Sequence, residues 1–432
     1  MRKGWKQIKL GDIIHIKHGY GFKGEYFVEE PNENILVTPG NFSIGGGFKD
    51  GKMKYYDGPI NDEFVLSEGD VIVTMTDLSK QADTLGYSAK VPKDERHTYL
   101  HNQRIGLISL LTKDFDIDFI YWLLRTHSYQ KYIAGSSSGA TVKHTSPKKI
   151  YSTKLAVPKS KETQRKIASI LSAYDDLIEN NLKRIKLLEE QAQQTYEEWF
   201  VRFKFPGFEN AEYSEESGMP IGWKVTELGT LVILQTKMVH PRNLPNETPY
   251  IGLEHIPRKS FTLSNWETAA KVESAKYSFK KHDILFGKIR PYFHKVGVAL
   301  IDGIASSDTI ILRPKRSNIH GFILQTVFSD HFVDSATQSS NGTKMPRANW
   351  NVLKKYPVII PTNDFIHKYE KINNLILDTI SSCVNQNKLL KEARDILLPR
   401  LMTGMIDVDS LEVNEGLGMV AEESEKYNIE KK

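Results

Sequence analysis

Many side chains of this 432-residue sequence could do chemistry, but few stand at the spacings that enzymes use. The segment GGFKDGKM, at 46–53, fits the phosphate-loop pattern GxxxxGK. However, Met53 replaces the Ser or Thr hydroxyl that would hold Mg²⁺, and a strand-like segment follows instead of a helix. The thirteen histidines show no HExxH or cysteine-paired spacing, so no metal site is expected. We predict no catalytic residue.

Charge is distributed unevenly along the chain. The formal net charge is only +5, yet residues 231–361 carry 18 Lys and Arg against 9 Asp and Glu. The last segment, 405–432, has 3 basic against 8 acidic residues and is expected to be a flexible acidic tail. The basic excess favours a polyanionic partner, although a basic domain that binds no polyanion stays an equal alternative.

Composition predicts a protein of the cytoplasm with two or more folded domains. Hydrophobic residues make up 40% and charged residues 26% of the chain. The single cysteine, Cys383, excludes an intrachain disulfide, and the start MRKGWKQIKLGD does not resemble a signal peptide. No run approaches the roughly 20 apolar residues that span a bilayer, so no membrane partner is expected.

Two β-rich segments alternate with two long helical ones, which predicts a mixed α/β chain of the α+β type. Residues 1–158 and 206–361 contain short apolar runs, such as GDIIHI and GDVIVTMT, between Gly, Pro and Asp clusters. In 161–200 and 365–401, apolar residues recur every three or four positions between charges. The first predicted helix has some 38 residues and is about 57 Å long at 1.5 Å per residue. We expect the helical segments, 159–205 and 362–404, to pack antiparallel on each other.

The order of segments reflects an internal repeat. Six stretches of the first half return in the same order in the second: GWKQIKLGD as GWKVTELGT, GDVIVT as HDILFG, TLGYSAKV as KVGVALI, DFIYWLL as GFILQTV, SSSGATVK as SSNGTKMP, and KLAVP as YPVIIP. Six matches in one order indicate a tandem duplication of domain plus helix. The helices then become equivalent spacers between two similar heads.

These residues resemble a known family. The stretch QRKIASILSAYDDLIENNLKRIKLLEEQAQQTYEEWFVRFKFPG is similar to the central conserved region of the specificity (S) subunits of type I restriction-modification systems, and LLPRLMTGMIDV resembles their C-terminal conserved segment. WKQIKLGD and WKVTELG are similar to the starts of the two target recognition domains of that family. The resemblance covers essentially the whole chain except the acidic tail.

The resemblance implies a non-catalytic reader of double-stranded DNA. Each head would read one half of a split, asymmetric sequence, and the helices, related by a pseudo-two-fold axis, would fix the gap between the halves. The helices would also dock two methyltransferase (M) subunits, which carry S-adenosylmethionine, and two restriction (R) subunits, which use ATP and Mg²⁺. This chain would bind no cofactor itself.

Loops that combine basic, amide and aromatic groups are the expected DNA contacts, since Lys and Arg hold phosphates and Arg, Lys, Asn or Gln reach base edges. In the first head these are Tyr20, Lys23, Lys80, Gln81, Lys143 and His144; in the second they are Lys237, Arg242, Lys288, Arg290, Tyr292, Lys344 and Arg347. The repeat makes the 76–86 and 287–297 loops equivalent, as it does the 139–148 and 342–350 loops. A solvated surface charge is the alternative at each position, and Arg290, before Pro291, can equally serve a turn.

Six residues of the helical segments are assigned to the spacer or to partner docking: Asn181, Ile185, Leu188, Trp199, Phe200 and Leu390. Asn181, with Asn385 and Asn387, would form a polar layer that fixes helix register, but simply exposed asparagines are the alternative that we favour. Trp199 and Phe200 are expected either in internal packing, which we favour, or on the docking surface.

Two other functions stay open. A fused adenine methyltransferase would bind S-adenosylmethionine alone, but the sequence has no NPPF-like or DPPY-like signature. A scaffold or interaction protein would show no sequence preference and no steep salt dependence of DNA affinity.

Overall fold

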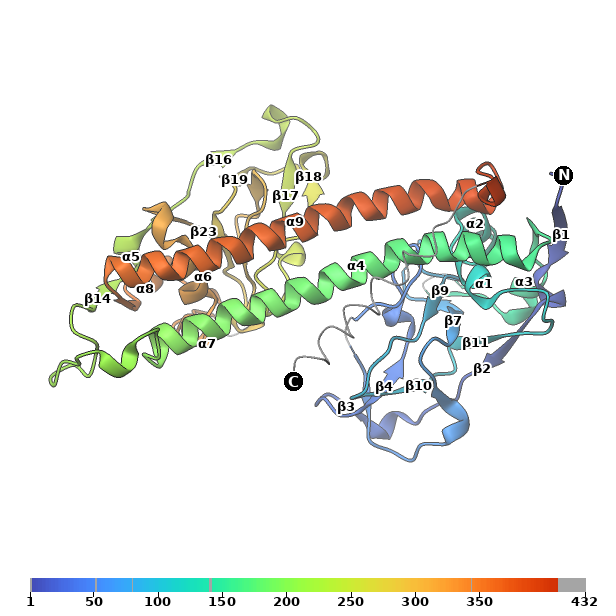
Figure 1. Cartoon of the computed structure of the whole chain (residues 1–432), viewed down its shortest axis with the longest axis horizontal. Helices are drawn as coiled ribbons and strands as arrows, with labels where there is room; N and C mark the ends of the chain where they lie inside the picture. Colours follow the sequence, from blue (N-terminus) through green and yellow to red (C-terminus); the bar gives the residue numbers. More distant parts are fainter. Residues whose placement is uncertain (1, 51–52, 80, 140–141, 343, 411–432) are drawn as a thin grey trace. The chain divides into compact units, whose positions relative to one another are not determined.

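The computed structural model describes residues 2–50, 53–79, 81–139, 142–342 and 344–410 (Figure 1). It divides into two compact units: residues 1–177 with 390–432, and residues 178–389. Each unit contains one β-rich head together with parts of both long helices. The first head precedes helix α4 (Lys161–Tyr196), and the second lies between α4 and helix α9 (Asn363–Met402).

The first head contains three main sheets and three short helices. A four-stranded sheet has the order β2 (Ile14–His18), β11 (Ile105–Leu110), β7 (Val71–Thr74), β9 (Ser88–Lys90). A five-stranded sheet has the order β3 (Phe27–Val28), β5 (Tyr55–Tyr56), β4 (Asn34–Val37), β10 (Thr98–His101), β6 (Val65–Leu66). Strand β1 (Trp5–Lys9) pairs with β13 (Lys154–Pro158), and the helices are α1 (Ile117–Leu123), α2 (His127–Gly135) and α3 (Pro147–Tyr151).

The second head has nearly the same topology. Its four-stranded sheet has the order β15 (Val232–Leu234), β23 (Thr309–Pro314), β20 (Ile284–Gly287), β21 (Val296–Val298). Its five-stranded sheet has the order β16 (Met238–Val239), β19 (Lys276–Phe279), β22 (Gly303–Ala305), β17 (Pro249–Ile251), β18 (Glu267–Thr268). Strand β14 (Lys224–Glu227) pairs with β24 (Pro357–Ile360), and the helices are α5 (Leu228–Leu231), α6 (His320–Phe328), α7 (Asp330–Gln338) and α8 (Trp350–Leu353).

Comparison of the two heads confirms the predicted duplication. The six matched stretches fall on equivalent elements: β1 and β14, β7 and β20, β9 and β21, α1 and α6, the loops after α2 and α7, and β13 and β24. In both five-stranded sheets the central pair is parallel, between β4 and β10 and between β17 and β22. The heads differ at an edge, because β3 pairs with β5 whereas β16 pairs with β19.

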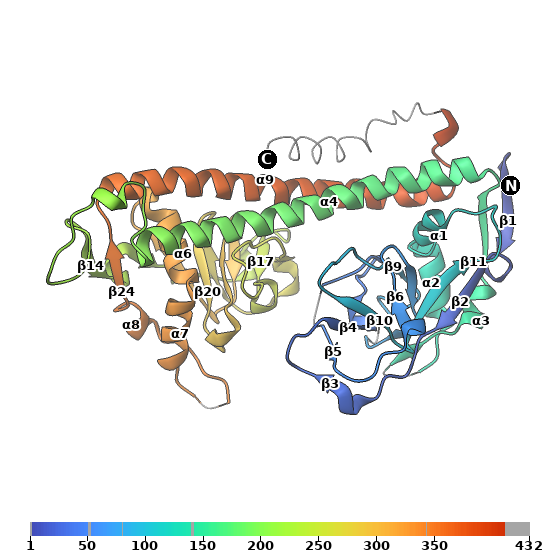
Figure 2. The same ribbon diagram turned by 60° about the horizontal axis from the view of Figure 1, so that its bottom comes forward.

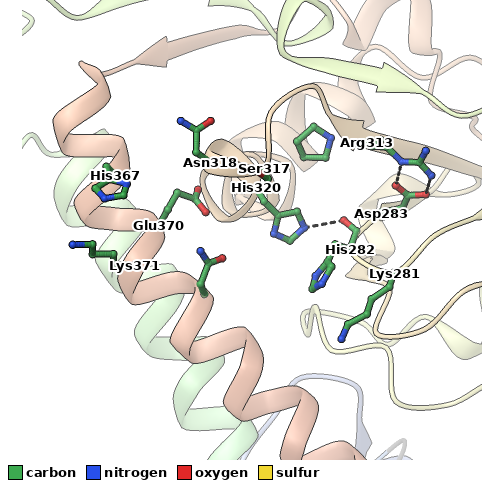
Figure 3. A pocket seen from close by; sticks show the side chains of 12 residues that line it. Lys281, His282, Asp283, Arg313, Ser317, Asn318, His320, His367, Glu370 and Lys371 are labelled. Atoms are coloured by element: carbon green, nitrogen blue, oxygen red, sulfur yellow. Dashed lines mark hydrogen bonds and ion pairs between the residues drawn. The ribbon is translucent and has the colours of Figure 1, made fainter.

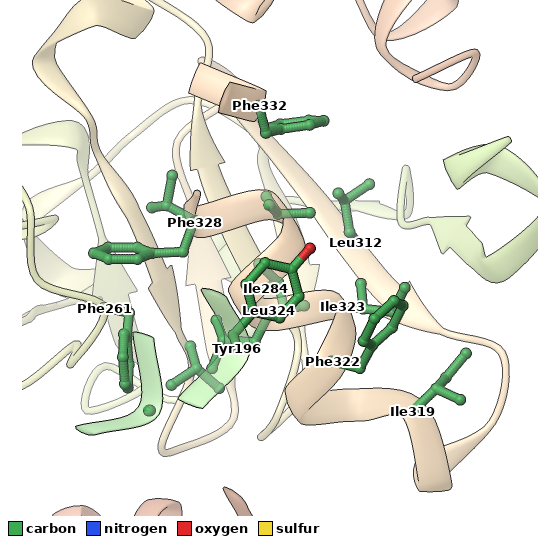
Figure 4. Close-up of a cluster of buried hydrophobic side chains, with 14 of the residues drawn as sticks. Tyr196, Phe261, Ile284, Leu312, Ile319, Phe322, Ile323, Leu324, Phe328 and Phe332 are labelled. Atoms are coloured by element: carbon green, nitrogen blue, oxygen red, sulfur yellow. The ribbon is translucent and has the colours of Figure 1, made fainter. Parts of the chain in front are cut away.

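Apolar clusters on both faces of the four-stranded sheets explain why these short strands are stable. All four residues of β7 and all four of β20 are buried, as expected for strands covered on both faces. In the second unit, Phe322, Ile323 and Leu324 of α6 pack on Ile284 and Leu312 of the sheet (Figure 4). Burying each such side chain stabilises the fold by about 1.5–3 kcal/mol.

The two long helices match the predicted helical segments closely. Helix α4 continues from Tyr196 into a π-helical turn, Glu197–Val201, and α9 contains Pro399 near its end. Within each unit, the parts of α4 and α9 run antiparallel and lie side by side (Figures 1 and 2). The segment 405–410, expected to belong to a flexible tail, is instead folded, because Val408 is buried in the core of the first unit and Thr163 donates a hydrogen bond to Asp409. Residues 411–432 lie outside the described residues.

Candidate nucleic-acid interface

In the first head, several candidate residues gather at one end of the four-stranded sheet. The antiparallel register places Gly106 opposite His18 and Thr74 opposite Ile105, so β2 and β7 end where β11 begins. The chain continues from β7 into β8 (Thr76–Asp77), which pairs with β12 (Lys143–His144). This end of the sheet therefore carries a short two-stranded arm that presents Lys143 and His144.

The second head forms the equivalent arm. Ile289, just beyond β20, bridges to Arg347, and Arg347 also bridges to Asn341. In the first head, His144 pairs with Thr76 as Arg347 pairs with Ile289, and it bridges to Ser138 as Arg347 bridges to Asn341. His144 and Arg347 thus occupy equivalent positions, and the predicted equivalence of the paired loops is confirmed in each head by backbone pairing.

The remaining first-head candidates lie as follows. Tyr20 follows β2, is 44% exposed and packs edge-on against Phe22. Lys23 is exposed and lies 3.6 Å from Glu25, and Gln81 is exposed. Lys143 is half-buried, whereas His144 is exposed, with its Nδ1 3.1 Å from Thr76 Oγ1. Lys80 lies outside the described residues.

The second-head candidates fall into two groups. Lys237, Arg242, Tyr292 and Lys344 are exposed. Lys288 and Arg347 lie together on the arm, and Arg347 Nη2 is 3.7 Å from Asp308 Oδ1. Burial lowers the pKa of Lys288, which Asp308 partly restores and Arg347 lowers further.

Arg290 has the geometry of a turn residue. Its φ of +51° is left-handed, and its backbone N–H donates to Pro346 O at 2.8 Å as the chain enters the turn Pro291–Phe293. Its Nε is buried without a hydrogen-bond partner among the described residues. The turn alternative is therefore the better account of Arg290.

Asp77, which was not predicted from the sequence, organises the loop that follows β8. This buried carboxylate accepts hydrogen bonds from the backbone N–H groups of Ser79 and Thr84 and from the Thr84 hydroxyl, at 2.6–2.8 Å. Burial alone would raise the pKa of Asp77, but these hydrogen bonds lower it below its ordinary value. The spacing Asp-x-Ser in TDLS is the local signal, since Asp commonly accepts from the N–H two residues on.

Asn181 forms the predicted polar layer between the helices of the second unit. Its side-chain amide donates to Asn387 Oδ1 at 2.9 Å and to Gln386 Oε1 at 3.2 Å. Asn387 is buried, whereas Asn385 is exposed. The favoured interpretation, simply exposed asparagines, is therefore wrong for Asn181 and Asn387 and holds for Asn385 alone.

The other spacer residues are mainly packing residues. Trp199 and Phe200 are buried in the core of the second unit, where Phe200 packs edge-on against Phe322 and Tyr369. These two side chains are therefore unavailable for docking, and the favoured packing interpretation holds. Ile185 is buried and Leu188 partly buried in the same core, and Leu390 is partly exposed.

In each unit, one carboxylate of α4 ties the head to the spacer: partly buried Asp175 in the first and buried Glu189 in the second. In the first unit, Asp175 lies 2.5 Å from both Arg125, next to α1, and Arg394 of α9. Burial would raise the pKa of Asp175, but the two guanidinium groups hold it below its ordinary value. In the second unit, Glu189 Oε1 accepts from Ser260 Oγ and from both N and Oγ1 of Thr262, at 2.6–2.9 Å.

A hollow of ≈480 Å³ in the second unit lies between this head and α9 (Figure 3). Its two buried carboxylates are already engaged. Asp283 accepts two hydrogen bonds from Arg313 at 2.7 Å, and Glu370 accepts from the N–H groups of Gly321 and Phe322 at the start of α6. His320 donates from Nε2 toward His282 O at 2.8 Å. The Glu370 contacts fasten the head to α9, and the Asp283 and His320 contacts hold the head together beside it.

The described parts of the chain contain neither a metal-ligand cluster nor a membrane-spanning helix. There, no cluster of three or more His, Cys, Asp or Glu side chains could hold a metal ion. No helix in those parts combines the length and apolar character needed to cross a membrane.

Comparison with known proteins agrees with two tandem heads. The profile of the family described as type I restriction modification DNA specificity domain matches residues 2–190 and again 220–397. The chain therefore belongs to this family and carries its domain twice.

Relatives and solved structures are similar over most of the chain. The MjaIX specificity subunit of a type I restriction enzyme from Methanocaldococcus jannaschii is 25% identical, over 71% of this chain and 73% of its own length. The EcoDI specificity subunit from Escherichia coli is 27% identical, over 62% of this chain and 65% of its own. The crystal structure of a type I restriction-modification S subunit from M. genitalium has the same fold, with a TM-score of 0.55 at 17% identity, covering 92% of this chain and 96% of that one.

Proposed function

We propose that this chain is the DNA sequence-specificity subunit of a type I restriction-modification complex. Each head reads one half of a split, asymmetric target in double-stranded DNA, and the spacer helices set the gap between the halves. The observation that carries this proposal is the pair of equivalent arms: one scaffold presents His144 in the first head and Arg347 in the second. The same framework with different side chains is what reading two different half-sites requires.

The chain acts without catalysis of its own in this proposal. Two methyltransferase subunits dock on the spacer and bring S-adenosylmethionine, while two restriction subunits bring ATP and Mg²⁺. Exposed leucines along the two helices support such docking: Leu177, Leu182, Leu187, Leu375 and Leu389. Large apolar side chains that stay exposed on a helix are available to a partner that covers them.

Co-expression with the methyltransferase subunit tests the proposal. Mapping methylated adenines in genomic DNA should reveal a split motif with a fixed gap. Exchange of one head, with the junction between residues 210 and 220, should change one half of the motif and leave the other unchanged. Methylation that is independent of this chain would disprove the specificity function.

The same experiment separates the alternatives. A fused methyltransferase would bind S-adenosylmethionine and methylate DNA as the purified single chain. A scaffold would support assembly of the complex without any sequence preference, and its DNA affinity would not fall steeply with salt.

A further inference from the structure

A hollow of ≈410 Å³ opens at the arm of the second head. Its walls come from residues at the end of β15 and just after it, from β19, from the end of the pairing where β20 stops and β23 begins, and from the loop before α8. The lining side chains that carry the argument are Gln235, Tyr277, Lys288, Thr309, Arg347 and Asn349. All of them belong to the second unit.

The free polar groups of this hollow are mainly hydrogen-bond donors. Lys288 and Arg347 have donors only, and no carboxylate of the described residues lies within ion-pair distance of Lys288. Asn349 already uses its side-chain oxygen to accept from the N–H of Asn351, which leaves its NH₂ group free. Asp308, 3.7 Å from Arg347, orients the guanidinium group without pairing closely with it.

Two observations indicate that the hollow is prepared for a ligand. Thr309 is only 2% exposed, and its hydroxyl has no hydrogen-bond partner among the described residues. Lys288 is partly desolvated beside the ring of Tyr277, at 5.9 Å, which lowers its pKa. A buried polar group without a partner costs about 1–3 kcal/mol, and an acceptor-rich ligand would remove that cost.

The first head lacks this donor set. Backbone pairing makes Met75 equivalent to Lys288, since Met75 O accepts from Thr145 just as Lys288 O accepts from Ala348. Ser146 precedes α3 where Asn349 precedes α8, and His144 replaces Arg347. At these equivalent positions of the described residues, the donor set is therefore a feature of the second head.

We propose that this hollow is a guanine-reading site, in which Arg347 and Lys288 donate to the O6 and N7 acceptors of one guanine in the major groove and the Asn349 amide assists. Among the four bases, guanine presents two acceptors side by side on that edge, which matches a set of donors. This inference rests on the proposed function and deepens it by naming a base class for the second half-site.

The test uses the full chain co-expressed with its methyltransferase subunit. Lys288→Met gives the second head the residue of the first, and Arg347→Lys keeps the charge but removes the fork of donors. Each variant should lower discrimination at a single guanine of one half-site by roughly 5- to 150-fold, while the other half-site stays unchanged. Lys271→Ala, which removes an exposed lysine paired with Glu267 on another part of this head, is the matched control and should keep the wild-type motif.

Several outcomes would overturn the site. Relaxation at a base other than guanine contradicts the donor match, and an unchanged motif in both variants shows that the hollow reads no base. A uniform loss at every sequence, with a shallower salt dependence, would make Lys288 and Arg347 phosphate contacts. Thermal melting checks that each variant is folded. A wild-type chain that directs no split methylation would instead disprove the proposed function, and this inference with it.

Discussion

Asn181 and Asn387 are joined by a 2.9 Å hydrogen bond between side-chain amides, where α4 and α9 pack in the second unit. Asn387 is buried, and its own NH₂ group also reaches Ile178 O at 3.4 Å. Apolar residues occupy the neighbouring core positions Ile185 and Ile380. The two amides of a single polar pair between apolar helix faces can form this hydrogen bond only in one alignment of the helices. The pair therefore fixes the register of the helices and adds little to their stability.

Leucine substitutions at Asn181 and Asn387 should distinguish the effect of the pair on stability from its effect on helix register. Asn181→Leu alone leaves Asn387 with an unmet acceptor and should lower the free energy of unfolding by about 1–3 kcal/mol. The double change, Asn181→Leu with Asn387→Leu, should regain that loss but allow the helices to slip. Thermal melting measures the first effect, and a crystal structure measures the second. An unchanged register in the double variant would disprove the role of the pair.

Glu189 should be important for holding the second head on α4. Glu189→Ala removes the acceptor of three hydrogen bonds and leaves Ser260 and Thr262 unsatisfied, so unfolding should become easier by about 1–3 kcal/mol. Because burial raises the pKa of Glu189, the neutral isostere Glu189→Gln should cost less. Glu190→Ala, at the next and exposed position, is the control and should change stability by less than about 0.5 kcal/mol. Equal melting of the two alanine variants would contradict the anchor.

The sequence was sufficient to predict the heads and helices because their patterns are local. Spacings of three and four residues define α4 and α9, and alternation between buried runs and turns defines the strands. The duplication made the prediction stronger, because the matched stretches that form β7 and β20 show the same strand pattern in both halves. The repeat also predicted which loops of the two heads are equivalent, and the backbone pairing of each arm agrees with that.

Tertiary contacts explain what the sequence could not predict. Asp116 caps α1 from the adjacent position, a pattern visible in the sequence, but α6 is capped by Glu370 from a distant helix. Likewise, Lys237 and Lys288 are the same residue type in the sequence. Only the fold shows that Lys237 is exposed and that Lys288 is partly buried. Such distinctions depend on which segments meet, and no spacing along the chain records that.

Asp175 should make the first unit sensitive to the loss of one carboxylate. Asp175→Ala leaves Arg125 buried without its counter-charge and should cost about 3–5 kcal/mol of unfolding free energy. The pKa of Asp175 is lowered in the folded state, so its contribution is present above the unfolded pKa, near 3.8, and is lost as the pH falls through the folded pKa. Denaturant unfolding of the variant at pH 7 measures the loss. Glu179→Ala, which removes only an exposed ion pair with Lys183, should change little.

His320 should make the second unit less stable in acid. Burial lowers the pKa of His320 to about 4 from an ordinary 6.5. The unfolded chain therefore takes up its proton first, and stability should fall between about pH 6.5 and pH 4. His320→Gln keeps a donor for His282 O but cannot titrate. As the pH falls through this range, the melting temperature of the wild type should therefore fall more than that of the variant. A difference in melting temperature that is independent of pH would refute the assignment.

Exposed lysines near the arm of the second head should bind phosphate and carry no sequence information. Lys237 and Lys344 are exposed, and neither has an ion-pair partner among the described residues, so each is free to neutralise one phosphate. Removal of one such contact should reduce the slope of log affinity against log salt by roughly 0.9 and weaken binding to all sequences alike. Titration of target and unrelated duplexes with the assembled complex, at several salt concentrations, measures both effects for Lys344→Ala. The Lys271→Ala control should retain the wild-type slope, and a Lys344→Ala variant that weakened binding to the target alone would mean that Lys344 reads a base instead.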